Sequence, residues 1–65
     1  MDKSIGDKIR ERRKELKMTQ QTLADKSKIS RGTVNSIECG MLHDVRIGTL
    51  SAIAEALGTT VDSFF

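Results

Sequence analysis

The side chains that could do chemistry in this sequence are few, and they gather in its middle. Residues 30–40, SRGTVNSIECG, hold an arginine, an asparagine, three hydroxyl groups and the one cysteine of the chain. With one His in all, and no Gly-rich phosphate loop or HExxH spacing, catalysis has little support. One Cys and one His exclude an intramolecular disulfide and fall short of a four-ligand zinc site. The chemistry left is recognition by hydrogen bonds, with no enzyme activity, metal, cofactor or small-molecule ligand expected.

On a helix over residues 30–38, side chains advance by about 100° per residue, and Val34 and Ile37 then face inward. The opposite arc carries Arg31, Gly32, Asn35, Ser36 and Cys39. A glycine inside a helix costs about 0.8–1.0 kcal/mol relative to Ala, which indicates that another surface approaches closely there. Such a face suits the major groove of DNA, where Arg bonds guanine and Ser or Asn bonds base edges or phosphate. A merely solvated face is the alternative, although Glu, Lys and Gln would usually be commoner on one.

Five helical stretches must position that face. Polar residues and glycines separate them, and no strand-length alternation of apolar residues occurs, so the predicted fold class is all-α. The stretches cover residues 4–17, 19–27, 30–38, 48–57 and 61–65. Ser4 or Asp2 is expected to cap the first, Thr19 the second and Ser30 the third, and Gly40 to end the third.

Only residues 27–29 separate the second and third stretches. Two short helices joined by so tight a turn must cross at a large angle, which is the helix-turn-helix unit. The N-terminus of the second helix offers free N–H groups and a partial positive charge to a phosphate. Gln20, in its first turn, could add a side-chain donor, although Gln is also an ordinary surface residue.

Length and charge set the wider limits. The 65 residues make one domain, which buries only about 60% of its unfolded surface, so help from a second chain is expected. Residues 1–38 carry ten Lys or Arg against six Asp or Glu, whereas residues 39–65 carry one against three. A basic half suits a polyanion, but a solvated helix face would show the same excess. With no secretory signal and no apolar run of about 20 residues, we expect a cytoplasmic protein.

The segment MTQQTLADKSKISRGTVNSIECG resembles the phage repressor and Cro-type helix-turn-helix family. The matching residues are Thr19-Gln20, Leu23-Ala24, Ile29-Ser30, Val34, Ile37-Glu38, Gly40, Thr49-Leu50, Ile53-Ala54 and Ala56-Leu57-Gly58. The resemblance runs from Ile9 to Phe64 and implies a compact five-helix domain, bacterial or phage-encoded. It implies a repressor that binds a pseudo-palindromic operator in double-stranded DNA as a homodimer, with the third helix in the major groove.

The resemblance also assigns the site residues. It implies base contacts from Arg31, Gly32 and Ser36. Contacts with the DNA backbone are expected from Gln20, Ser30, Thr33, Asn35, Cys39 and Arg46. Arg13 falls near the apolar stripe of the first helix, and the family pattern pairs it with Glu38 in a structural ion pair. Lys28 departs from the pattern, because many members have a left-handed Gly there, and a non-Gly residue costs roughly 1–2 kcal/mol.

Several assignments stay open. An antitoxin, or another protein-interaction module that also binds DNA, is the alternative function, disfavoured by the lack of a tail beyond Phe65 to wrap a toxin. His43, in the loop with Arg46, is an exposed loop residue or a second DNA contact. Cys39 is a plain small residue or a redox switch, and nothing in the sequence indicates a lowered thiol pKa.

The position of a dimer interface is the least constrained expectation. Phe64 follows Val61 by three residues and is expected in the core. We expect Phe65, with Val61 and the loop before the fourth helix, to lie at the interface between two copies.

Overall fold

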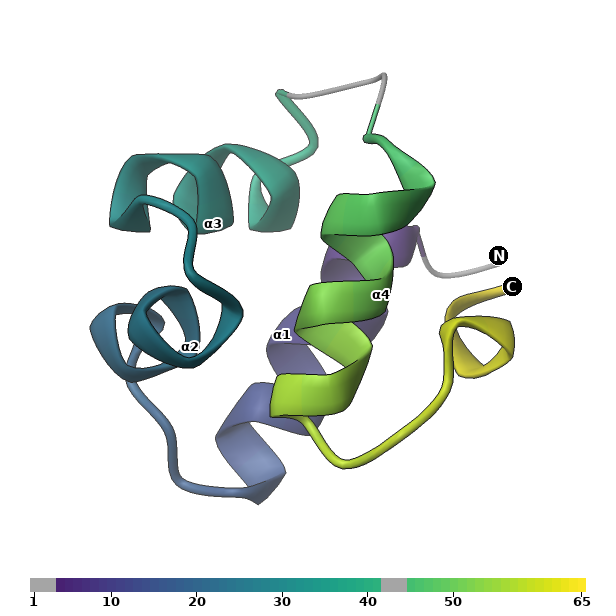
Figure 1. Cartoon of the computed structure of the whole chain (residues 1–65), viewed down its shortest axis with the longest axis horizontal. Coiled ribbons are helices and arrows are strands. Elements are labelled where there is room, and N and C mark those ends of the chain that lie inside the picture. The colour runs from purple at the N-terminus through teal and green to yellow at the C-terminus, as the bar shows by residue number, and fades with distance from the viewer. Residues whose placement is uncertain (1–3, 42–44) are drawn as a thin grey trace.

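The computed structural model describes residues 4–41 and 45–65. These residues form α1 (Ile5–Glu15), α2 (Gln20–Ser27), α3 (Arg31–Glu38), α4 (Ile47–Ala56) and the 3-10 turn η1 (Val61–Phe64) (Figure 1). The all-α class is confirmed. The prediction of a fifth α-helix was wrong. Residues Val61–Phe64 make only a single 3-10 turn, and such short helical runs favour the 3-10 form. No helix in the described part of the chain has the length and apolar character needed to cross a membrane.

Side-chain caps begin the first three helices. The Ser4 hydroxyl accepts the N–H of Asp7 at 3.1 Å, and the Asp7 carboxylate accepts the N–H of Ser4, which closes a capping box. Thr19 and Ser30 each accept the N–H three residues further on, both at 3.1 Å. The caps predicted at these three residues are confirmed. They fix where α2 and α3 start, and therefore the length of the turn between them.

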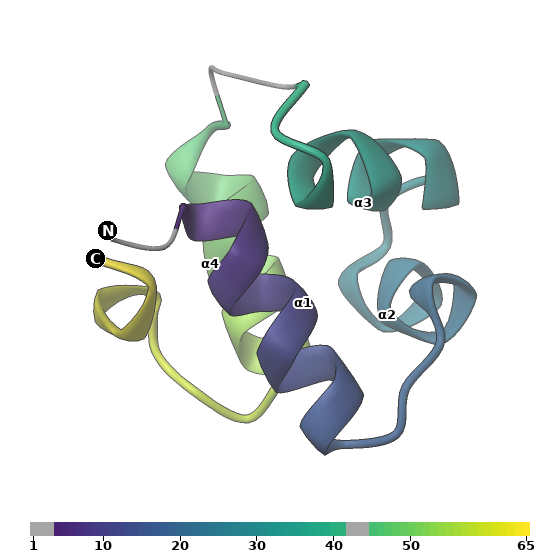
Figure 2. The same ribbon diagram turned by 180° about the vertical axis from the view of Figure 1, so that it is seen from behind.

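The elements enclose one aliphatic core with a single aromatic ring. α2 packs against α3 and α4, α1 packs against α3, and η1 contacts α1 and α4 (Figures 1 and 2). The buried hydrophobic residues are Ile9, Leu23, Ala24, Val34, Ile37, Leu50, Ile53, Ala54, Leu57 and Phe64. Phe64 is 2% exposed and closes the core as expected, whereas its neighbour Phe65 is 70% exposed.

The turn between α2 and α3 keeps the left-handed residue that the family pattern implies. Lys28 has φ 59° and ψ 39°, and the N–H of Ile29 bonds the Ala24 carbonyl at 3.0 Å. A lysine in this conformation costs roughly 1–2 kcal/mol relative to glycine, so the turn is retained at some expense in stability. Lys17, between α1 and α2, is also left-handed, with φ 56°.

The backbones of α1 and α3 meet at Gly6. A Cβ atom added to Gly6 would overlap the carbonyl oxygen of Ile37 and would lie 3.1 Å from the Cα of Glu38. Gly6 is buried, so no other residue fits there without moving one helix. The close approach fixes the C-terminal end of α3 against the first turn of α1.

Candidate nucleic-acid interface

α3 has one face in the core and one in solvent, as its sequence predicts. Val34 and Ile37 are buried, whereas Arg31, Gly32 and Asn35 are exposed. On the outward side, Cys39 is exposed at the C-cap, and Ser36 and Thr33 are half-buried. The predicted readers therefore share one side of one helix, and Arg31 begins it.

Gly32 lies in the first turn of α3, not in its middle. Its cost in helix propensity is therefore smaller than the value of about 0.8–1.0 kcal/mol for a glycine inside a helix. A Cβ atom added there would meet only the Ser30 hydroxyl, 3.9 Å away. In contrast to Gly6, Gly32 is not required by any contact within the described residues.

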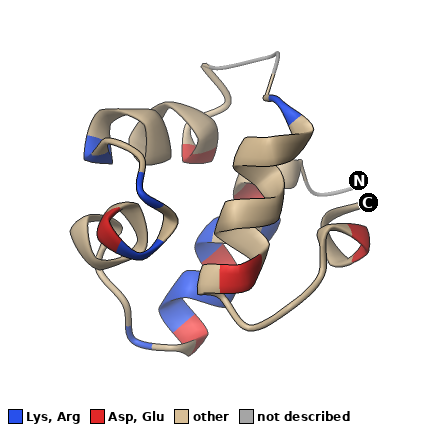
Figure 3. Ribbon diagram, viewed as in Figure 1, with Lys and Arg blue, Asp and Glu red and all other residues tan. Residues whose placement is uncertain are grey.

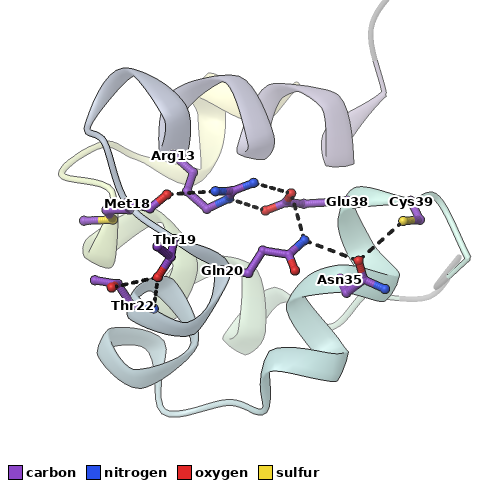
Figure 4. Close-up of polar contacts among 8 residues, drawn as sticks. All are labelled: Arg13, Met18, Thr19, Gln20, Thr22, Asn35, Glu38 and Cys39. Carbon is purple, nitrogen blue, oxygen red and sulfur yellow. Dashed lines mark hydrogen bonds and ion pairs between the residues drawn. The ribbon is translucent and has the colours of Figure 1, made fainter.

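A buried ion pair joins α1 to the end of α3. Arg13 Nε lies 2.8 Å from Glu38 Oε2 and Nη2 lies 2.9 Å from Oε1, while Nη1 donates to the Met18 carbonyl at 2.7 Å (Figure 4). The two side chains are only 11% and 2% exposed, so the bidentate geometry must offset their desolvation. The hydrogen bond to Glu38 raises the pKa of Arg13, against the opposing effect of burial. Arg13 therefore remains a cation at every ordinary pH, and the ion pair that the family pattern implies is present.

Gln20 continues this arrangement toward the surface. Its Nε2 atom donates to Glu38 Oε1 and to Asn35 Oδ1, both at 3.3 Å, and Cys39 Sγ lies 3.7 Å from the same Asn35 oxygen (Figure 4). Both N–H bonds of the Gln20 amide are used within the chain in this conformation, so its expected contact with a phosphate stays a prediction that requires these bonds to break. The backbone N–H groups of Gln20 and Gln21 have no helical acceptor and remain available.

The other residues expected to contact the DNA backbone lie at the start of α3 and at the start of α4. Ser30 and Thr33 share a hydrogen bond of 2.8 Å between their hydroxyls, in addition to the cap. Arg46 is exposed but belongs to another element, as the N-cap of α4. His43 lies outside the described residues. Among the described residues, no three His, Cys, Asp or Glu side chains form a group that could hold a metal ion.

Five of the eleven basic residues are on α1 and one is on α3 (Figure 3). The bonded cations of α1 are Lys8 with the carbonyls of Phe64 and Phe65, Arg10 with Asp7, Arg12 with Glu15 and the Leu57 carbonyl, and Arg13 with Glu38. In α3 the one basic side chain is Arg31. Three of these basic residues, Lys8, Arg12 and Arg13, therefore join α1 to other parts of the chain.

Comparison with known proteins gives a consistent family. A helix-turn-helix family model matches residues 9–64. The restriction-modification controller protein C.AhdI from Aeromonas hydrophila is 30% identical, with a TM-score of 0.90 over 94% of this chain and 91% of that one. The P22 c2 repressor, in complex with a synthetic operator, is 26% identical, with a TM-score of 0.89 over 98% of this chain and 96% of that one.

SinR, a master regulator for biofilm formation whose structure is of a complex with DNA, is 27% identical, with a TM-score of 0.88 over 92% of this chain and 95% of that one. No curated protein sequence matches the chain. The family model covers nearly all of the chain, and three independent repressor or regulator structures share its fold. The chain therefore belongs to the phage repressor and Cro-type helix-turn-helix family.

Proposed function

We propose that this protein is a sequence-specific DNA-binding transcription regulator, and specifically a repressor. α3 enters the major groove of a pseudo-palindromic operator, with Arg31, Gly32 and Ser36 toward the bases. The start of α2 and the residues flanking α3 contact the phosphates. Two of the similar structures, SinR and the P22 c2 repressor, are complexes with DNA.

The observation that carries this proposal is the outward face of α3. It presents Arg31 and the amide of Asn35 beside a glycine that no contact within the described residues requires. A surface that only faced water would gain stability from an alanine in place of Gly32. A side chain at position 32 would hold α3 away from the floor of the groove, which is a physical reason for a glycine there. A recognition helix also contacts bases mainly through its N-terminal residues.

Selection of bound sequences from random DNA tests the proposal. We expect one recovered motif with two-fold symmetry, and half-sites about 10–10.5 bp apart or a multiple of that spacing. Affinity for it should fall steeply with salt, since phosphate contacts release counterions. Recovery of no motif, or binding equal to that of scrambled DNA, would contradict sequence-specific regulation.

The same proposal includes a homodimer, and the structure offers a surface for it. Ile47 and Phe65, which are 65% and 70% exposed, line one hollow of about 490 Å³ with Ile5, Val45 and Leu50. Exposed apolar side chains gathered around one hollow are typical of an interaction surface. Val61, which was expected at the same interface, packs against the core but does not line this hollow.

Sedimentation of the wild type and of Phe65→Asp tests the interface. A charge at Phe65 should shift the protein toward monomer without loss of helix content by circular dichroism, because Phe65 is exposed within one chain. Phe65→Leu, which keeps an apolar side chain, is the matched control and should remain dimeric. Unchanged dimerisation of Phe65→Asp removes Phe65 from the interface, and a wild-type mass that includes an unrelated chain favours the protein-interaction alternative.

A further inference from the structure

Glu38 determines which way the amide of Gln20 points. A carboxylate only accepts hydrogen bonds, and Arg13 already donates to both of its oxygens. The Gln20 atom 3.3 Å from Glu38 Oε1 must therefore be the nitrogen, which carries the hydrogens. The amide oxygen of Gln20 must then point away from the ion pair.

The same reasoning fixes Asn35. The second N–H of Gln20 reaches the Asn35 side chain at 3.3 Å, so the facing Asn35 atom must be the carbonyl oxygen. The Cys39 thiol approaches that oxygen from the next turn of α3 at 3.7 Å. Two donors use both lone pairs of the oxygen. The Asn35 Nδ2 group points away from Gln20 (Figure 4), and no acceptor for it occurs in the described part of the chain.

We propose that Asn35 presents only hydrogen-bond donors to DNA, because Glu38 and Gln20 hold its amide in one orientation. This rests on the proposed function. Bidentate recognition of adenine needs the oxygen of Asn as well as its nitrogen, and that oxygen is already occupied. Asn35 therefore binds an acceptor, which is a phosphate oxygen, guanine O6 or N7, or thymine O4. Gln20 is a positioning residue that acts on DNA through Asn35.

A double-mutant cycle on operator affinity tests the coupling. Gln20→Met keeps the length of the side chain and removes its donors, and Asn35→Ala removes the presented amide. Each single substitution should weaken binding to the selected operator by about three- to tenfold, as expected for one hydrogen bond. In the Asn35→Ala background, Gln20→Met should add less than about twofold. Losses that simply multiply would overturn the proposal.

Base preference is a readout that a merely structural role of Gln20 would not change. In the wild type, adenine should not be selected at the base pair nearest Asn35. Gln20→Met frees the Asn35 amide to turn, so the frequency of adenine at that base pair should rise. An adenine preference of the wild type that disappears in Asn35→Ala would overturn the proposal. If Asn35→Ala loses its preference at one base position only, the acceptor is a base. If it loses affinity equally for all sequences, the acceptor is a phosphate. Either result agrees with a donor-only Asn35.

The orientation can also be measured in the free protein, independently of DNA binding. By NMR, the side-chain amide protons of Gln20 should exchange slowly with water, while those of Asn35 should exchange as in an unstructured peptide. The opposite pattern would overturn the proposed orientation. If selection recovers no operator but the Gln20 protons are protected, the proposed function fails while the orientation of the amides stands.

Discussion

α1 and α3 differ in how they use polar side chains. α1 is rich in charge, but four of its basic residues bond carboxylates or carbonyls of the same chain. α3 has one basic residue, yet Arg31 has no carboxylate partner in the described residues, and the amide nitrogen of Asn35 has no acceptor there. A count of charges would locate the DNA surface on α1. The DNA surface proposed above lies instead on α3, where the donors of Arg31 and of the Asn35 amide have no partner in the described residues.

The largest expected effect is the loss of the buried carboxylate. Glu38→Ala leaves the Arg13 cation buried without its partner, and we expect a loss of about 3–5 kcal/mol in the free energy of unfolding. Urea denaturation followed by circular dichroism measures it. The double variant Arg13→Met with Glu38→Leu removes both charges and should unfold close to the wild type. If Glu38→Ala and the double variant were equally stable, Arg13 would not need its carboxylate partner, and the ion pair would have no structural role.

The backbone contact between α1 and α3 at Gly6 can be disrupted by adding a single methyl group. Gly6→Ala forces a methyl group against the Ile37 carbonyl, and a loss of about 1–3 kcal/mol is expected from the resulting overpacking. Gly48→Ala is the matched control, because Gly48 is the second residue of α4, as Gly6 is of α1, and nothing lies within 4 Å of the added atom. It should be neutral or slightly stabilising. Thermal unfolding separates the two variants, and similar melting temperatures would contradict the backbone contact.

Arginines on the two helices should differ in their effect on DNA. Arg31→Ala should weaken operator binding by about 1–3 kcal/mol and relax the preference at one base position. Arg10→Ala, which breaks only an exposed pair with Asp7, should leave affinity and specificity unchanged. Fluorescence anisotropy with the selected operator and its single-base variants measures both. If the two substitutions weaken binding equally, the basic excess of α1 acts on DNA after all.

The smallest effect concerns Gly32. Gly32→Ala should raise the free energy of unfolding by less than the roughly 0.5–1 kcal/mol expected inside a helix, because the site is open but lies in the first turn. The same methyl group should weaken operator binding if α3 lies deep in the groove. A variant that is more stable to unfolding but binds the operator more weakly would support close approach of α3 to DNA. A variant that binds as well as the wild type would leave Gly32 without a recognition role.

Local patterns were enough to predict the elements. A hydroxyl before a helical run, an apolar residue every three or four positions and a short polar turn are all encoded within a few residues. For that reason Ser4, Thr19 and Ser30 were identified as caps, and Val34 and Ile37 as inward residues. The ion pair of Arg13 with Glu38 was reached through the family pattern, since nothing local connects residues in different helices.

Contacts between elements were beyond the sequence. Gly6 looks like any glycine near a helix start, and only the packed position of α3 shows why it has no side chain. Gln20 was expected to face a phosphate because its place at the start of α2 is visible in the sequence. Its distance from Glu38 depends on how α2 and α3 cross. The last turn was misjudged because helical spacing over five residues does not distinguish an α-helix from a 3-10 turn.

The close approach at Gly6 has a consequence for how the outward face of α3 could change during evolution. Main-chain atoms of α3 make that contact, so it persists whatever side chains the outward face carries. Residues such as Arg31 and Gly32 can then be exchanged without repacking the interior, and recognition can diverge on a constant scaffold. Asn35 is the exception, since its amide is tied to Gln20 and Glu38. A library that varies the outward face should therefore tolerate most changes at Arg31 and Gly32, and show paired changes at Gln20 and Asn35.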